Sequence, residues 1–150
     1  MSVNWNNDKS IVLSQICTAV FALILLFIDV GAYWLVSSYT RLKELVGAQG
    51  MILTTVYLCS VPAWILLWKL WSLLGNIKRG EIFTAENVSA LRTVSWCCAA
   101  AAIVCLVSAL YFLPFFIVAV AAAFMCLIVR IVKNTFQQAL LMKDELDLTV

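Results

Sequence analysis

Long apolar stretches alternate with short polar ones along the whole chain. Four of the apolar stretches are long enough to cross the hydrocarbon core of a bilayer, which needs about 20 residues of helix. The predicted spans are at about residues 11–32, 51–74, 94–113 and 114–132. A loop, residues 75–93, separates the second span from the third, and a tail, residues 133–150, follows the fourth. The pattern predicts an all-α, four-helix membrane bundle forming a single domain, residues 1–150.

No polar residue separates the third span from the fourth, so the position of that boundary depends on length. As one helix, residues 94–132 would run about 58 Å, whereas the hydrocarbon core is about 30 Å thick. The chain must therefore reverse within this stretch. Pro114 is the expected place, because proline suits the first turn of a helix and disfavours helix in the residue before it.

Lysine and arginine are unevenly distributed between the two sides that this topology defines. Of the ten, only Arg41 and Lys43 fall on the side opposite the termini and the 75–93 loop. Because cytoplasmic segments carry the excess of positive charge, both termini are expected in the cytoplasm and the chain in a plasma membrane. The net charge of +2 is too small for direct binding of nucleic acid, which needs a dense basic patch.

The composition excludes most soluble classes and offers little for catalysis. Apolar residues make up 65% of the chain and charged residues 12%. These are too few polar residues to cover the surface of a soluble helical bundle. Histidine is absent, and the six cysteines lie in apolar runs without C-x-x-C spacing. We therefore expect no enzyme, no metal site and no cofactor, with cysteine acting as a small apolar residue.

Asp29 and Lys69 are the candidate intramembrane charges. An acidic residue in a span is a functional candidate by default, which singles out Asp29. It comes about 27 Å after Ile11, so we expect it near the outer interface, meeting Arg41 or Lys43. Lys69, between two tryptophans, is expected near the inner interface, too distant in depth to pair with Asp29.

Small residues recur at helical spacing in the last two spans. Such faces let membrane helices approach closely, either within the bundle or between copies in a homo-oligomer. Packing within the bundle is favoured, because these two spans are joined tightly. The residues are Cys98, Ala102, Cys105 and Ala109 in one span and Ala119, Ala123 and Cys126 in the next.

The 75–93 loop contains the start signal of a helix. Thr84 is a good N-cap, Glu86 follows in the first turn, and Phe83 can pack on Val88. A short cytoplasmic helix should therefore lead into the third span. In the tail, Phe136 and Leu140 have helical spacing, so a helix is expected to leave the membrane there and to contact the loop or another protein.

The run from Gly80 to Val88, closing with Leu91 and Arg92, resembles the signature of the YoaS-like bacterial membrane proteins. The ending, residues 147–150, is similar to the C-terminal motif of that family. The resemblance covers essentially the whole chain and implies a bacterial membrane protein of uncharacterised activity. It transfers a signature rather than catalytic residues: Gly80, Phe83, Thr84, Asn87, Leu91 and Arg92.

Members of that family are often encoded beside a small Cro-type helix-turn-helix regulator, which implies a regulatory pair. The first hypothesis is therefore an interaction protein that presents the loop and the tail to such a regulator. The alternative is a transport, transport-accessory or immunity protein that acts as an oligomer.

Overall fold

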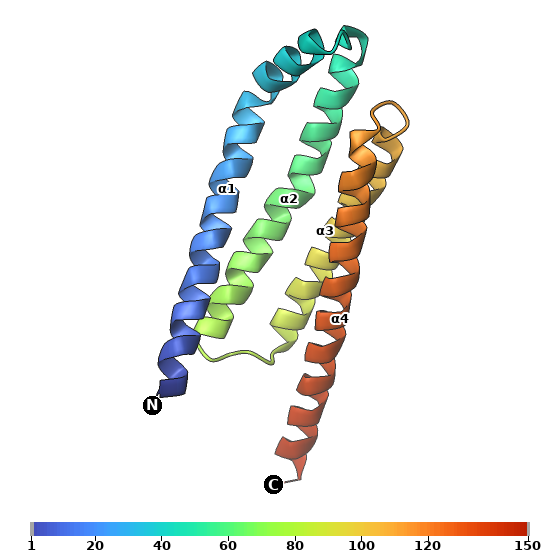
Figure 1. Ribbon diagram of the computed structural model, residues 1–150. Helices are drawn as coiled ribbons and strands as arrows, with labels where there is room; N and C mark the ends of the chain where they lie inside the picture. Colours follow the sequence, from blue (N-terminus) through green and yellow to red (C-terminus); the bar gives the residue numbers. More distant parts are fainter. Residues whose placement is uncertain (1, 150) are drawn as a thin grey trace.

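The computed structural model describes residues 2–149, which form four long helices (Figure 1). The helices are α1 (Ser2–Leu42), α2 (Gln49–Lys78), α3 (Ala85–Ser108) and α4 (Pro114–Leu148), with a short 3-10 helix η1 (Val46–Ala48) before α2. All four are long and apolar enough to cross a membrane, and the described residues contain no strand. The predicted all-α fold with four spanning helices is confirmed.

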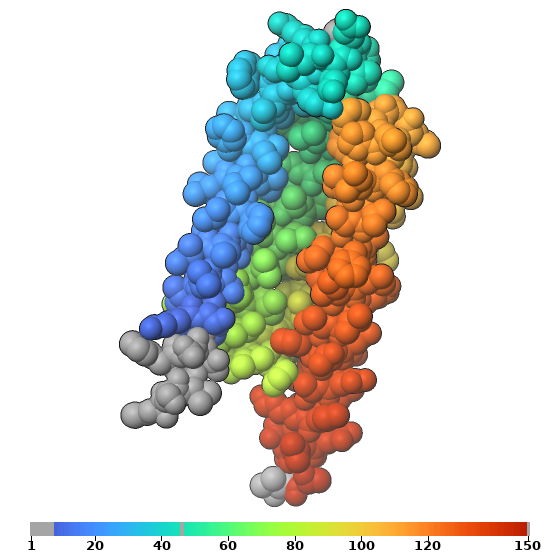
Figure 2. All heavy atoms as spheres, in the orientation of Figure 1, coloured from blue at the N-terminus to red at the C-terminus, as the bar shows by residue number. Residues whose placement is uncertain are grey.

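The helices pack in the order of the chain. α1 packs on α2, α2 on α3, and α3 on α4, and across the described residues α1 makes no close backbone approach to α3 or α4. In the space-filling view, α2 is visible between α1 and α4 (Figure 2). The start of α1, the α2–α3 loop and the end of α4 lie at one end of the molecule, and the α3–α4 turn lies at the other (Figure 1).

The observed helix boundaries agree with the predicted ones where a cap or a proline starts a helix. They differ where a helix continues into polar residues. α4 begins at Pro114 and α3 directly after Thr84, as predicted. α1, in contrast, continues to Leu42, well beyond the predicted end of the first span at residue 32. The hydroxyl of Thr40 donates to the carbonyls of Val36 and Ser37, so polar residues here are compatible with helix. Polarity marks where the chain leaves the membrane, not where the helix ends.

The core is narrow and made largely of small side chains. Buried positions concentrate on α3, where Cys98 and Cys105 face the neighbouring helices, and Ala119 is buried on α4. The Sγ atoms of Cys105 and of Cys59 on α2 are 3.7 Å apart. Much of the predicted small-residue face is therefore used within the bundle, which supports the packing interpretation. Most large apolar side chains point outward, as expected for a lipid-facing surface.

Candidate functional site

Two buried asparagines hold the α2–α3 loop, residues 79–84. The Asn76 side chain donates to the side-chain oxygen of Asn87 at 2.9 Å. The Asn87 amide in turn donates to the carbonyls of Glu81 and Ile82, each at 2.7 Å. Asn87 is 0% exposed, so its bonds are shielded from water. We call Asn76 and Asn87 the asparagine latch, because they tie the end of α2, the loop and the start of α3 together.

The ends of the loop are fixed by a glycine and a threonine. Gly80 has a φ of 82°, in the left-handed region that glycine adopts readily, and its N–H donates to the carbonyl of Ile77. Thr84 accepts a hydrogen bond from the backbone N–H of Asn87 at 3.3 Å, which confirms the predicted N-cap. Glu86 lies in the first turn of α3, where a negative charge is favourable.

The other signature residues connect α3 to its surroundings. Leu91 is buried, while Glu86 and Arg92 are exposed. The ring of Phe83, expected to pack on Val88, lies 5.5 Å from the ring of Phe136 on α4. The loop and the tail are therefore in contact, as the sequence suggested.

α4 continues without a break through the tail, residues 133–148, and extends beyond the loop (Figure 1). A shallow hollow of about 280 Å³ lies between the start of α3 and the tail, with Val88 and Leu140 in its wall. Four large apolar side chains of the tail are exposed beside three acids. They are Leu141, Met142, Leu146 and Leu148, and the acids are Asp144, Glu145 and Asp147. We call the loop, residues 85–92 and the tail the loop–tail platform; Val150 lies outside the described residues.

Asp29 has different partners from those expected. Its carboxyl group accepts hydrogen bonds from the indole N–H of Trp64 at 2.8 Å and from the hydroxyl of Ser60, both on α2. Ser60 and Trp64 lie about 17 and 23 Å from the start of α2, near the middle of that helix. The expected pairing of Asp29 with Arg41 or Lys43 is therefore wrong. The cause is that α1 continues for several turns beyond Asp29.

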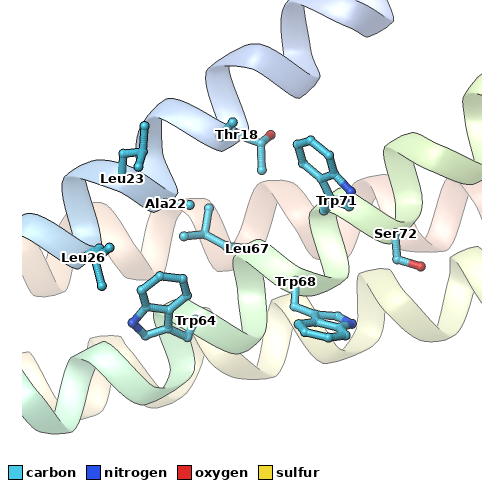
Figure 3. Close-up of a pocket in the computed structure, with 10 residues that line it drawn as sticks. Thr18, Ala22, Leu23, Leu26, Trp64, Leu67, Trp68, Trp71 and Ser72 are labelled. Carbon is cyan, nitrogen blue, oxygen red and sulfur yellow. The ribbon is translucent and has the colours of Figure 1, made fainter.

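A groove adjoins this carboxyl group between α1 and α2. Its volume is about 830 Å³, and three tryptophans of α2 (Trp64, Trp68 and Trp71) line it opposite apolar side chains of α1 (Figure 3). Trp64 both contacts Asp29 and lines the groove, so the polar site around Asp29 borders an open apolar surface. Lys69 is not among the partners of Asp29, in keeping with their predicted separation. The described residues contain no cluster of ligands suited to a metal ion.

The profile of a family described as proteins of unknown function, DUF2975, matches residues 34–150. The chain belongs to the DUF2975 family. The matched range contains the whole loop–tail platform and the hydrogen-bond donors Ser60 and Trp64, whereas Asp29 precedes it. No curated protein and no solved structure matches this DUF2975 member.

The sequence indicated one residue of each site, Asn87 and Asp29, but not the residues that they bond to. Asn87 stood out within the signature, but Asn76 did not. A polar residue in the last turn of α2, directly before the loop, was the available signal. Ser60 and Trp64 had no such signal, because the pairing of α1 with α2 depends on how far each helix extends.

Proposed function

We propose that this DUF2975 member is a YoaS-like, non-enzymatic interaction protein of the bacterial plasma membrane. Its loop–tail platform faces the cytoplasm, as the distribution of lysine and arginine indicates, and binds a small Cro-type helix-turn-helix regulator. The observation that carries the proposal is the tail: an ordered helix that extends beyond the bundle, contacts the loop and exposes apolar side chains among acids.

The chemistry of the tail suits a small DNA-binding partner. Exposed apolar side chains outside the membrane-facing part of a helix mark a contact surface, and Met142 and Leu146 share one face at i, i+4 spacing. Asp144, Glu145 and Asp147 surround them with negative charge. DNA-binding domains carry a basic surface, so the charges are complementary and also favour fast association.

Charge reversal in the tail tests this function. The full chain in native membranes is cross-linked and purified, as wild type and with Asp144→Lys, Glu145→Lys and Asp147→Lys. The control carries Glu44→Lys, an exposed acid beyond the other end of α1. Capture of a helix-turn-helix protein by the wild type and the control, but not by the tail variant, supports the proposal. Equal capture by all three, or by none, contradicts it.

The Asp29 site supports a second candidate, transport by an oligomer of this chain. A carboxyl group with Ser60 and Trp64 as partners, near mid-helix and beside an open groove, is the type of polar group that lines a solute path. Flux of cations or protons into vesicles reconstituted with the protein should then fall in Asp29→Asn. A wild type without flux above empty vesicles removes this candidate.

A further inference from the structure

A small basic hollow lies between α3 and α4, and the exposed tail side chains proposed to bind the regulator do not line it. Its volume is about 130 Å³. Two arginines and a lysine contribute to its wall together with Trp96 and small side chains, and no acidic residue does. The three cations are Arg92, Arg130 and Lys133. Within the described part of the chain, none of the three side chains has an ion pair or a side-chain hydrogen bond.

Three like charges around one hollow repel one another unless an anion lies between them. Arg92 belongs to the signature, but neither the helix cap nor the asparagine latch engages its side chain. Lys133, the least exposed of the three, is half-buried, so its charge is partly removed from water. This arrangement suits a ligand with several acceptor oxygens and negative charge, and two guanidinium groups favour a phosphate.

The depth of the hollow points to a lipid rather than to a soluble anion. Arg92 and Arg130 each lie about 24 Å from the α3–α4 turn, measured along their own helices from Ser108 and Pro114. In a bilayer with a hydrocarbon core of about 30 Å, this is about 6 Å short of the level where the apolar core meets the headgroups, a gap that a long arginine side chain can bridge. Trp96 lies one helical turn after Arg92, toward the α3–α4 connection, and its side chain is 68% exposed. An exposed tryptophan at this level is typical of the aromatic belt of membrane proteins.

We propose that this hollow binds the phosphate of an anionic phospholipid. The guanidinium groups of Arg92 and Arg130 donate to the phosphate oxygens, and Lys133 supplies a third positive charge. The acyl chains then pass Trp96 along the apolar surfaces of α3 and α4. Basic pockets between membrane helices at headgroup level bind anionic lipids in this way.

Native mass spectrometry of the full chain, released from micelles containing equal amounts of phosphatidylglycerol and phosphatidylcholine, tests the site. We expect the wild type to retain phosphatidylglycerol preferentially. Each cation should contribute about fivefold, so single changes to glutamine should reduce the preference by about that factor. The triple variant Arg92→Gln, Arg130→Gln, Lys133→Gln should retain the two lipids equally.

The matched control removes three exposed cations elsewhere, Arg41→Gln, Lys43→Gln and Lys143→Gln. It should keep the wild-type preference; an equal loss would show diffuse attraction and overturn the proposal. Arg92→Lys with Arg130→Lys keeps the positive charges without the guanidinium groups, and should retain more of the preference than Arg92→Gln with Arg130→Gln, which separates lost binding from lost folding. A wild type that retains both lipids equally would also overturn the proposal. Complete displacement of the lipid by millimolar inorganic phosphate would overturn it too, because it would indicate a site for the free anion.

Discussion

The two ends of the molecule reverse the chain by different chemistry. At the α3–α4 turn, side-chain hydroxyl groups are hydrogen-bonded to one another. The hydroxyl oxygen of Ser108 lies 2.8 Å from the hydroxyl oxygens of both Thr55 and Tyr111. Aromatic rings close over this turn, with Phe112 5.9 Å from Tyr39 and 5.4 Å from Phe115. At the α2–α3 loop, buried amides bind backbone carbonyls, and the tail extends past the loop.

This difference indicates which end interacts with other molecules. The turn uses its polar groups internally and exposes apolar side chains such as Leu110 and Leu113, which suits a surface at the membrane boundary. At the loop end, the buried asparagines hold the loop backbone by hydrogen bonds. Charged and apolar side chains of the tail stay exposed there. A preformed backbone with free side chains is what a docking surface requires, because little ordering remains to be done on binding.

The largest effect is expected from breaking the asparagine latch. Asn87→Leu leaves the Asn76 amide and two loop carbonyls without their partner, and should destabilise the fold by about 3 kcal/mol. The measurement is unfolding in mixed detergent micelles followed by circular dichroism. Asn134→Leu, at an exposed position on α4, is the control and should change stability little. Similar losses in the two variants would show that the latch has no special role.

A pair of glycine substitutions should have effects of opposite sign. Gly80→Ala forces a side chain into a left-handed conformation and should cost about 1 to 2 kcal/mol. Gly75→Ala, inside α2 with open space around it, should stabilise the protein by roughly 0.8 kcal/mol. The same unfolding assay compares them, and stabilisation by both would contradict the assigned loop conformation.

Loss of the helix cap should have a smaller effect. Thr84→Ala removes the acceptor for the Asn87 N–H and should destabilise the fold by about 1 kcal/mol, whereas Thr84→Ser should retain most of the stability. Hydrogen exchange should also become faster in the first turn of α3. Equal stability of the alanine and serine variants would mean that the cap contributes nothing.

The smallest effect is expected at the opposite end. Ser108→Ala should cost about 0.6 kcal/mol, typical of a hydrogen bond between membrane helices, because Thr55 and Tyr111 still contact each other. Hydrogen exchange in residues 79–84 should be unchanged. Faster exchange in that loop would show that the two ends are coupled, which removes the distinction drawn between them.

The sequence predicted the elements that depend on local chemistry. Pro114 and Thr84 mark helix starts because proline geometry and a capping hydroxyl act within one turn, and both positions were correct. The end of α1 was not predictable in this way. Residues 33–42 lie beyond the predicted span and contain no helix breaker, so the helix continues through them.

Partners across the bundle were beyond the reach of the sequence. Asp29 meets Ser60 and Trp64 because the connection between α1 and α2, residues 43–48, is short and brings residues at similar distances from it side by side. Asn87 belonged to the signature, but its bond to Asn76 depends on how the end of α2 and the start of α3 lie together. In both cases the missing information was the three-dimensional arrangement of neighbouring helices.

The most direct test of the loop–tail platform as a docking surface is residue-specific photo-cross-linking in native membranes. A photoreactive amino acid is placed at Met142 or Leu146 in the tail, and at Leu113 in the turn as an equally exposed control. We expect a small helix-turn-helix protein to be captured from both tail positions and not from Leu113. Capture of such a protein from Leu113 alone, or capture of none from the tail, would contradict it.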